Sequence, residues 1–147
     1  MINLDLSKDQ KRKCFQIKHD LKGINLIEKC LISFSLIKEI LQKENYLSLA
    51  TVDDKGVWVV DIFYINIDLN IYWLSQPAAR HSSAIKSNPH VAGTITLTQK
   101  PGEPDLGLQI EGNAERREGD NLQLATKHRL KRNKPAPLKE GEIFEHG

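Results

Sequence analysis

The sequence contains little cysteine and no long apolar run. Its 147 residues include two cysteines, Cys14 and Cys30, which lie in the N-terminal part of the chain and do not form a CxxC pair. Redox or metal chemistry based on cysteine is therefore not expected, and free thiols in a reducing cytoplasm are the favoured interpretation. No stretch approaches the roughly 20 apolar residues of a membrane span, and residues 1–13 lack the apolar segment of a signal peptide. The sequence thus predicts a cytoplasmic protein without membrane attachment.

Known catalytic and metal-binding motifs are also absent. The chain has no GxSxG, HExxH or P-loop pattern, and its five histidines lack the spacing of metal ligands. The formal net charge of +2 is too small to indicate a nucleic-acid partner by itself. One basic run, TKHRLKRNK at 126–134, is compatible with a polyanion, but it has no aromatic residue for base stacking and also fits the outer face of a helix. We therefore expect neither a metal nor a nucleic acid.

What the sequence does contain is a series of short β-rich segments. Alternating apolar and polar residues predict strands at 46–52, 57–67, 71–74, 91–97 and 108–116. The turns DDKG at 53–56 and IDLN at 67–70 separate the first three strands, and a loop with two prolines covers 98–107. Gly112 inside the last strand predicts a bulge or bend.

Helical segments flank these strands at 36–43, 77–87 and about 120–130. Ser35 is the predicted N-cap of the first helix. Asp120 begins the last helix, with Gln123 as its capping-box partner and Leu122, Ala125 and Leu130 on its inner side. The pattern indicates a mainly β protein, a small β-barrel with flanking helices, in one domain at 33–147. Residues 1–32 are predicted to be an N-terminal extension with poor order.

A polar segment between two apolar strands raises the question of an anion. Arg80, His81, Ser82 and Ser83 lie where a strand is followed by a helix, and free backbone N–H groups at a helix start bind anions. An arginine adds a bidentate fork suited to phosphate. Ser75 at the strand end and Lys86 one turn further on are candidates for the same site. From spacing alone, a solvated helix start with capping serines is the favoured interpretation of this segment, because an isolated RHSS sequence is a weak signal.

Two polar residues inside predicted strands are ambiguous. Asp61 interrupts the apolar run VVDIFY, and Gln109 lies early in the fifth strand. Alternation allows both side chains to face solvent, and it also allows both to face a cleft and bind a ligand. Aromatic residues in the same strands, such as Trp58 and Phe63, are expected in the core or in an interface.

Three segments, taken in order, carry a resemblance to a known family. They are YLSLATVDDKGVWVVDIFYINIDLNIYWLS, ARHSSAIKSNPHVAGTI and GLQIEGNAERREGD. Together they resemble the pyridoxamine 5′-phosphate oxidase-like family of flavin-binding split barrels, over about residues 37–134. The family pattern has a strand LATV, a D-x-G turn, a strand ending in Ser or Thr, an Arg-Lys or Arg-His pair, an N-P pair and a G-x-Q-x-x-G-x-A strand. The Arg80-His81 pair with VAGT is most similar to an uncharacterised bacterial branch of the family.

The resemblance implies a homodimer with FMN bound between the subunits. It assigns the FMN phosphate to Arg80 and Ser82, with Ser75 donating from the strand end. His81 stands where most relatives have a lysine, so its part in phosphate binding is expected to be weaker, because an unperturbed histidine is mostly uncharged at neutral pH. Lys86 remains a further candidate for the same anion.

The same resemblance assigns residues to the rest of the cofactor. Gln109 matches the family glutamine and is expected to reach the isoalloxazine ring or the ribityl chain. Asp61, Ile62 and Phe63 fall on the strand whose backbone lines the flavin ring in the family.

The resemblance also has a departure at the C-terminus. The chain ends at Gly147 without the segment that the oxidase uses for its pyridoxal substrate. We therefore expect a shortened chain that does not oxidise pyridoxamine phosphate and whose barrel or dimer is weakened. The expected function is an FMN-dependent oxidoreductase acting on an unknown small molecule. The alternatives are a non-catalytic flavin or haem storage protein, with His81 or His90 as an axial ligand, and a nucleic-acid-binding barrel.

Overall fold

A six-stranded antiparallel barrel with three helices makes up the structure. The structure is a computed structural model that describes residues 1–5, 26–97, 100–103, 106–119 and 121–138. The strands of this part are β1 (Ile2–Asp5), β2 (Tyr46–Asp53), β3 (Gly56–Ile67), β4 (Asn70–Trp73), β5 (His90–Thr96) and β6 (Gly107–Arg116). Its helices are α1 (Leu26–Lys43), α2 (Arg80–Ser87) and α3 (Leu122–Lys131). The predicted mainly β barrel with flanking helices is confirmed.

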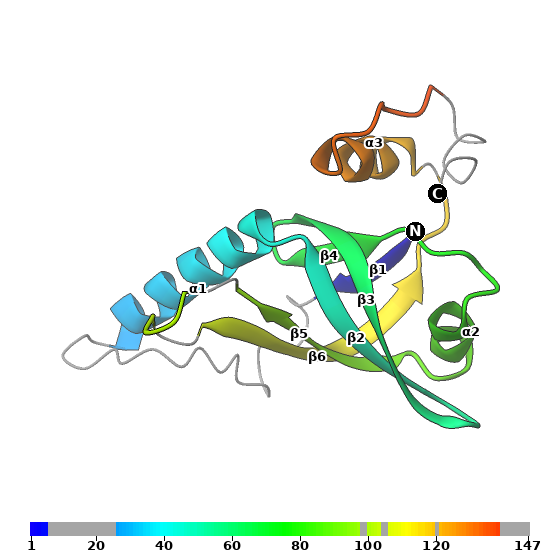
Figure 1. Ribbon diagram of the computed structural model, residues 1–147, viewed down its shortest axis with the longest axis horizontal. Helices are drawn as coiled ribbons and strands as arrows, with labels where there is room; N and C mark the ends of the chain where they lie inside the picture. Colours follow the sequence, from blue (N-terminus) through cyan, green and yellow to red (C-terminus); the bar gives the residue numbers. More distant parts are fainter. Residues whose placement is uncertain (6–25, 98–99, 104–105, 120, 139–147) are drawn as a thin grey trace.

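The strands close into a ring in the order β1-β4-β3-β2-β5-β6. The short β1 completes the ring, because it pairs antiparallel with β4 on one side and with β6 on the other. The β2–β3 hairpin is longer than its neighbours, and its tip projects beyond the barrel beside α2 (Figure 1). Gly56 at the tip has a φ of 108°, a conformation that glycine adopts without strain, and this confirms the predicted turn.

Alternation along the strands fills the barrel with apolar side chains. In β2, Leu47 and Leu49 are fully buried, whereas the alternate residues Ser48 and Ala50 face outward and are half-buried. A fully buried side chain of this size contributes about 1.5–3 kcal/mol. Tyr64 faces Trp73 across β3 and β4, and both rings are completely buried.

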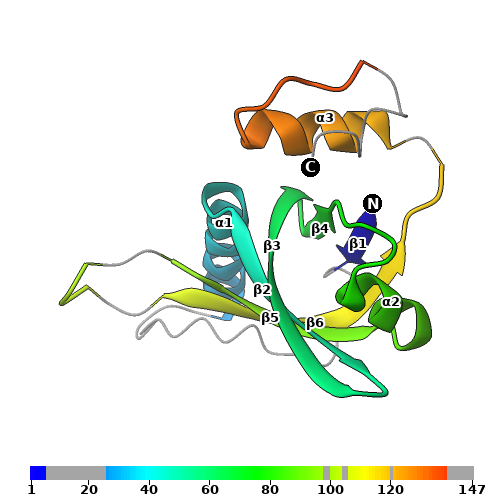
Figure 2. The same ribbon diagram turned by 45° about the vertical axis from the view of Figure 1, so that its right-hand side comes forward.

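Helix α1 closes one end of the barrel, and α3 lies across another part of the wall (Figure 2). Ile37, Ile40 and Leu41 of α1 pack into the core. The prediction that this helix begins after an N-cap at Ser35 is wrong, because α1 begins at Leu26 and Ser35 is an exposed residue in its middle. The upstream sequence LIEKCLISF contains no glycine or proline that would end a helix.

Helix α3 docks through a face that only partly matches the predicted one: Ala125 is buried as predicted, but Leu130 is not. Leu124, Ala125 and His128 are buried, whereas Leu130 is 58% exposed. Position 130 is two residues past 128, about 200° around the helix, so it points away from the barrel. The helix is preceded by Asn121 without a side-chain cap, and the predicted cap Asp120 lies outside the described residues.

The structure differs from the sequence predictions at two further places, the expected bulge at Gly112 and the boundary of the N-terminal extension. Gly112 does not mark a bulge, because β5 and β6 pair without interruption and Val91 lies opposite Gly112. The boundary drawn between residues 32 and 33 falls inside α1, and Ile2–Asp5 of the predicted extension is part of the barrel. A four-residue strand has too little sequence for its alternation to stand out, whereas pairing on both edges stabilises it. Cys14 and residues 139–147 lie outside the described residues.

Candidate functional site

A pocket of about 380 Å³ opens beside β3, at the place where its neighbour β4 ends. The β3–β4 pairing stops at Tyr64 opposite Trp73, so residues 60–62 have β2 on one edge and no strand partner on the other in the described part of the chain. Five segments line the pocket: the first residue of β2, then β3, the loop after β4, the start of α2, and α3 with the residues that follow it. The volume lies within the usual range of about 300–1,000 Å³ for small-molecule sites.

A cluster of three polar side chains lies at the α2 end of this pocket. The Ser75 hydroxyl is 2.6 Å from His81 Nε2 and 2.6 Å from the Ser82 hydroxyl. Burial lowers the pKa of the His81 imidazole from its usual value, so the ring is uncharged at neutral pH. The cluster therefore offers hydroxyl and imidazole hydrogen bonds without a full positive charge.

Helix α2 begins at the same place without a cap. Its N-cap residue, Ala79, has extended backbone and no side-chain oxygen with which to satisfy the first N–H groups. The Ser83 N–H already bonds to the Ala79 carbonyl, at 3.0 Å. The preceding amides at 80–82 belong to the part of a helix that lacks intrahelical partners and favours negative charge.

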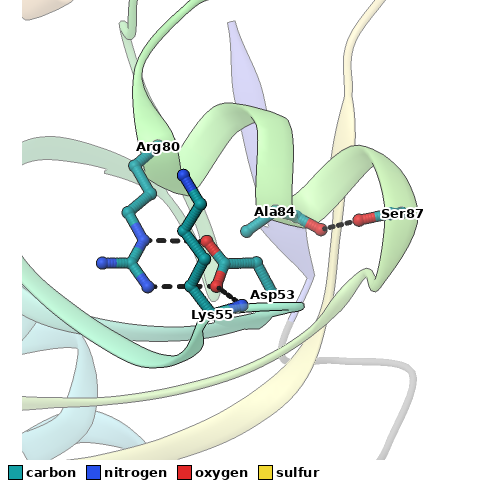
Figure 3. A network of polar contacts seen from close by, with 5 residues as sticks. All are labelled: Asp53, Lys55, Arg80, Ala84 and Ser87. Atoms are coloured by element: carbon teal, nitrogen blue, oxygen red, sulfur yellow. Dashed lines mark hydrogen bonds and ion pairs between the residues drawn. The ribbon is translucent and has the colours of Figure 1, made fainter.

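Arg80 lies in α2 but its side chain turns away from the pocket. Its Nε donates to Asp53 Oδ2 at 2.8 Å and its Nη2 donates to Asp53 Oδ1 at 3.0 Å (Figure 3). The guanidinium also lies 4.6 Å from the centre of the Trp58 ring. The hydrogen bonds from Arg80 lower the pKa of the Asp53 carboxyl to about 2, so the ion pair persists throughout the physiological pH range.

Three of the predicted cofactor residues lie on β3 beside the pocket. Asp61, Ile62 and Phe63 all line it. The Asp61 carboxylate is exposed and accepts a hydrogen bond from the Ser48 hydroxyl at 2.5 Å. Asp61 is therefore exposed to solvent and also lines the pocket, and its contact with a ligand stays a prediction.

Besides Arg80, three predicted residues do not line the pocket: Ser82, which reaches it only through its contact with Ser75, Lys86 and Gln109. Lys86 is exposed in the last turn of α2. Gln109 is exposed on β6, opposite Thr94 of β5, which in turn lies opposite Ser48 of β2. Because Ser48 also pairs with Asp61, one row across four strands runs from Asp61 to Gln109. At about 4.8 Å per strand the two ends are about 14 Å apart.

Sequence reasoning missed the α3 side of the pocket. His128, Arg129, Arg132 and Lys134 line it. All four belong to the basic run at 126–134, for which the sequence left open both a polyanion and the outer face of a helix. The run has five lysines and arginines and no acidic residue, which indicates a surface that attracts anions. Its position beside the pocket, however, depends on how α3 docks.

His128 is a buried contact between α3 and β3. Its ring lies 5.1 Å from the Phe63 ring in a T-shaped arrangement, and its Nε2–H donates to the Phe63 carbonyl at 3.3 Å. Burial lowers the pKa of His128 to about 4, and the nearby cations Arg132 and Lys131 act in the same direction. The imidazole is therefore neutral at physiological pH.

Lys131 ties the end of α3 to the barrel. Its Nζ donates to the Glu44 carbonyl at 2.7 Å and to the Tyr64 carbonyl at 3.2 Å. The ammonium also lies 4.4 Å from the centre of the Tyr64 ring. Burial lowers the pKa of Lys131 to about 8. These contacts hold the α3 wall of the pocket in place.

Metal sites and membrane spans were sought in the same part of the chain. No three histidine, cysteine, aspartate or glutamate side chains among the described residues come together as a metal site. Of the helices described, none combines the length and the apolar character needed to cross a bilayer.

The sequence profile of the pyridoxamine 5′-phosphate oxidase family matches residues 35–139, which include β2 to β6, α2 and α3. The chain belongs to this family. A UPF0306 protein of Photorhabdus laumondii is 30% identical over 95 residues, which is 63% of this chain and 66% of that protein. A UPF0306 protein of Yersinia pseudotuberculosis is 26% identical over 92 residues, 61% of this chain and 63% of that protein. The match thus spans just under two thirds of the length of these relatives.

Solved structures show the same fold. A conserved hypothetical protein of Mycobacterium tuberculosis superposes with a TM-score of 0.65 at 16% identity, covering 76% of this chain and 71% of that one. The heme storage protein HutZ of Vibrio cholerae superposes with a TM-score of 0.57 at 23% identity, covering 76% of this chain and 78% of that one. At these identities the likeness establishes the split-barrel fold and leaves the ligand open.

Proposed function

We propose that the chain binds FMN in the pocket beside β3 and acts as a flavin-dependent oxidoreductase on a small molecule. The observation that carries the proposal is the cluster of Ser75, His81 and Ser82 at the uncapped start of α2, next to the free edge of β3. Membership of the pyridoxamine 5′-phosphate oxidase family supports the same cofactor.

The α2 end suits the phosphate of the cofactor. The hydroxyls of Ser75 and Ser82 are 2.6 Å apart, and Ser82 lies in the first turn of α2, whose uncapped amides are the donors from which a phosphate at a helix start accepts hydrogen bonds. His81 adds a hydrogen bond from a neutral ring. These hydroxyls, the His81 ring and the first α2 amides would hold a phosphate through hydrogen bonds, and the start of the helix would add positive potential.

The free edge of β3 suits a flat heteroaromatic ring. Backbone N–H and C=O groups on a strand edge need partners, and the polar edge of an isoalloxazine ring carries matching donors and acceptors. Ile62 and Phe63 add apolar surface from the same strand, and Tyr46 stands 5.5 Å from Phe63 in a T-shaped contact. The residues present therefore fit the group.

A second copy of the chain completes the proposed site. Val52, Val57 and Val59 are 42%, 70% and 58% exposed on the outer face of the β2–β3 hairpin, the same face as Asp61 and Gln109. A homodimer would cover these valines. It would also bring Gln109 of one copy towards the pocket of the other, which explains why Gln109 lies outside the pocket of its own chain. Sedimentation of the purified protein measures this association.

When bound, the flavin would supply the electron transfer. The chain needs no acid or base of its own for that step. Ser75 and Ser82 hold the phosphate, the β3 edge orients the ring, and the aromatic pair Tyr46 and Phe63 excludes water from one side. Arg132 and Lys134 on the α3 side favour a small substrate with a polar or anionic group.

Haem binding without turnover is a second candidate, and one feature of the pocket favours it. His81 and His128 both line the pocket, and burial lowers the pKa of each, so both imidazoles are in the neutral form that ligates iron. The fold shared with the heme storage protein HutZ is consistent with this alternative.

An absorption spectrum and an FMN titration test the proposal. Ser75→Ala removes the hydroxyl that contacts both His81 and Ser82, and losing a hydrogen bond to a charged phosphate costs about 1.5–3 kcal/mol. We expect FMN affinity to fall about 10- to 100-fold, whereas affinity for riboflavin, which lacks the phosphate, changes little.

Ser87→Ala is the matched control. The Ser87 hydroxyl donates to the Ala84 carbonyl of its own helix and lies outside the pocket lining, so FMN affinity should stay the same. A Soret band in place of a flavin spectrum would move the assignment to haem. Wild-type protein that binds neither FMN nor haem would overturn both candidates.

A further inference from the structure

The start of α2 contains a cation that is held away from the pocket. Ala79 and His81 both line the pocket, whereas Arg80 between them does not. Its Nε and Nη2 both donate to Asp53, and the face of the guanidinium lies against Trp58. Asp53 and Trp58 come from the two strands of the β2–β3 hairpin, close to its tip.

The ion pair is accessible to a competing anion. The Arg80 side chain is 32% exposed and that of Asp53 is 14% exposed, so neither charge is sealed in the interior. A bidentate carboxylate occupies the same edge of the guanidinium that a bidentate phosphate would use. Arg80 therefore cannot give that edge to Asp53 and to a ligand at the same time.

We infer that Asp53 is an internal competitor for the anion-binding arginine of this site. Arg80 would bind Asp53 in the ligand-free chain and the phosphate group of the cofactor in the bound chain. This inference rests on the proposed FMN site and adds a regulatory element to it. The carboxylate of Asp53 lowers the affinity of the site for phosphate, and binding of the phosphate releases the hairpin tip from α2.

The exchange links the ligand to the hairpin tip. Figure 3 shows the Asp53 carboxylate bonded both to Arg80 and to the backbone of the hairpin turn, where Asp53 Oδ1 accepts the Lys55 N–H at 2.9 Å. When Arg80 leaves Asp53, the tip loses its two hydrogen bonds to α2 and the contact between Arg80 and Trp58. By linkage, a change that frees the tip must strengthen phosphate binding by the same factor.

Asp53→Asn tests the inference, with Asp54→Asn as its matched control. Both variants remove one negative charge from the same turn, but Asp54 makes no hydrogen bond to Arg80 in the described structure. We expect Asp53→Asn to bind FMN about 3- to 10-fold more tightly than wild type, and Asp54→Asn to differ by less than 2-fold. Riboflavin affinity should be the same in all three proteins, because it lacks the phosphate.

A double variant shows whether the gain runs through Arg80. Arg80→Ala is expected to weaken FMN binding. In that background Asp53→Asn should not raise FMN affinity, because the guanidinium for which Asp53 and the phosphate compete is no longer there. Hydrogen exchange adds a structural readout: amides at 52–58 should exchange faster with FMN bound in the wild type, whereas ordinary ligand binding slows exchange.

The outcomes separate the inference from the function on which it rests. Wild type that binds FMN, with weaker binding in Asp53→Asn, would show that Asp53 positions Arg80, and the inference would be overturned while the function stands. An equal gain in Asp54→Asn would reduce the effect to general charge and also overturn it. No FMN binding in any variant would overturn the proposed function and the inference together.

Discussion

The two helices that flank the pocket hold their polar groups in contrasting ways. On the α2 side, the Ser75 hydroxyl contacts both His81 and Ser82, and Arg80 is neutralised by Asp53. On the α3 side, Arg132 and Lys134 line the pocket, and His128 and Lys131 bond to backbone carbonyls of the barrel.

The two sides of the pocket differ in how far they depend on contacts between distant segments of the chain. The three side chains of the α2 cluster, Ser75, His81 and Ser82, lie within eight positions of one another along the chain. Helix α2 is also anchored to the barrel through buried Ile85 and through the Arg80–Asp53 pair. The α3 side exists only because buried and half-buried groups dock the helix onto the barrel. We therefore expect perturbation of docking to remove one side of the pocket and leave the other.

Leu124→Ala should have the largest effect. Leu124 packs with Met1, Ile65 and Tyr72 beneath α3, and truncating a buried leucine costs about 3 kcal/mol. Urea unfolding should show this loss, and hydrogen exchange should show α3 opening while α2 stays protected. Leu130→Ala, an exposed position on the same helix, should change stability by less than about 0.5 kcal/mol. Equal opening of both helices would refute the independence of the two sides.

Acidification should act more strongly through α3 than through α2. The pKa of His128 is lowered from 6.5 to about 4, so between these values the unfolded chain binds a proton that the folded chain does not. The contribution of neutral His128 to the free energy of unfolding is therefore fully present above pH 6.5. It is lost as the pH drops to about 4, which lowers the free energy of unfolding by on the order of 3 kcal/mol. His128→Gln should flatten the curve of unfolding free energy against pH in this window. The pKa of His81 is lowered in the same direction, and we expect His81→Gln to remove a smaller part of the slope.

Lys131→Met should have the smallest effect of the three. The substitution removes two hydrogen bonds to carbonyls, but it also removes the cost of taking an ammonium group out of water. The net destabilisation is expected to be about 1 kcal/mol at pH 7, measured by urea unfolding. Lys127→Met, which is exposed on the same helix, is the control and should match wild type. A gain in stability would mean that desolvation outweighs the bonds that Lys131 makes.

Much of the fold was predictable because its signals are local. The alternation of β2, with Leu47 and Leu49 inward, and the turn at Gly56 are encoded within a few residues. The segment around Arg80, His81 and Ser82 was likewise predicted as a polar site, since its residues are neighbours in the chain. The strand β1 was missed, because four residues carry too little pattern, and only pairing with β4 and β6 stabilises them.

Contacts between distant segments explain the misses at the site. The basic run at 126–134 was visible, but its composition does not say which side of the helix meets the barrel. That choice follows from Leu124 and His128 finding partners more than 50 residues away in the chain. Likewise, nothing near Arg80 in the sequence indicates that Asp53, 27 residues earlier, would occupy its guanidinium.

The sequence by itself determined the mainly β character, most strand positions, the polar segment at the start of α2 and membership of the family, because each is written in short-range pattern and residue order. Tertiary structure alone decided that β1 closes the barrel, that α3 supplies one wall of the pocket and that Asp53 holds Arg80 outside it. These features depend on hydrogen bonds and apolar burial between segments far apart in the chain, and such contacts form only when the whole barrel brings them together.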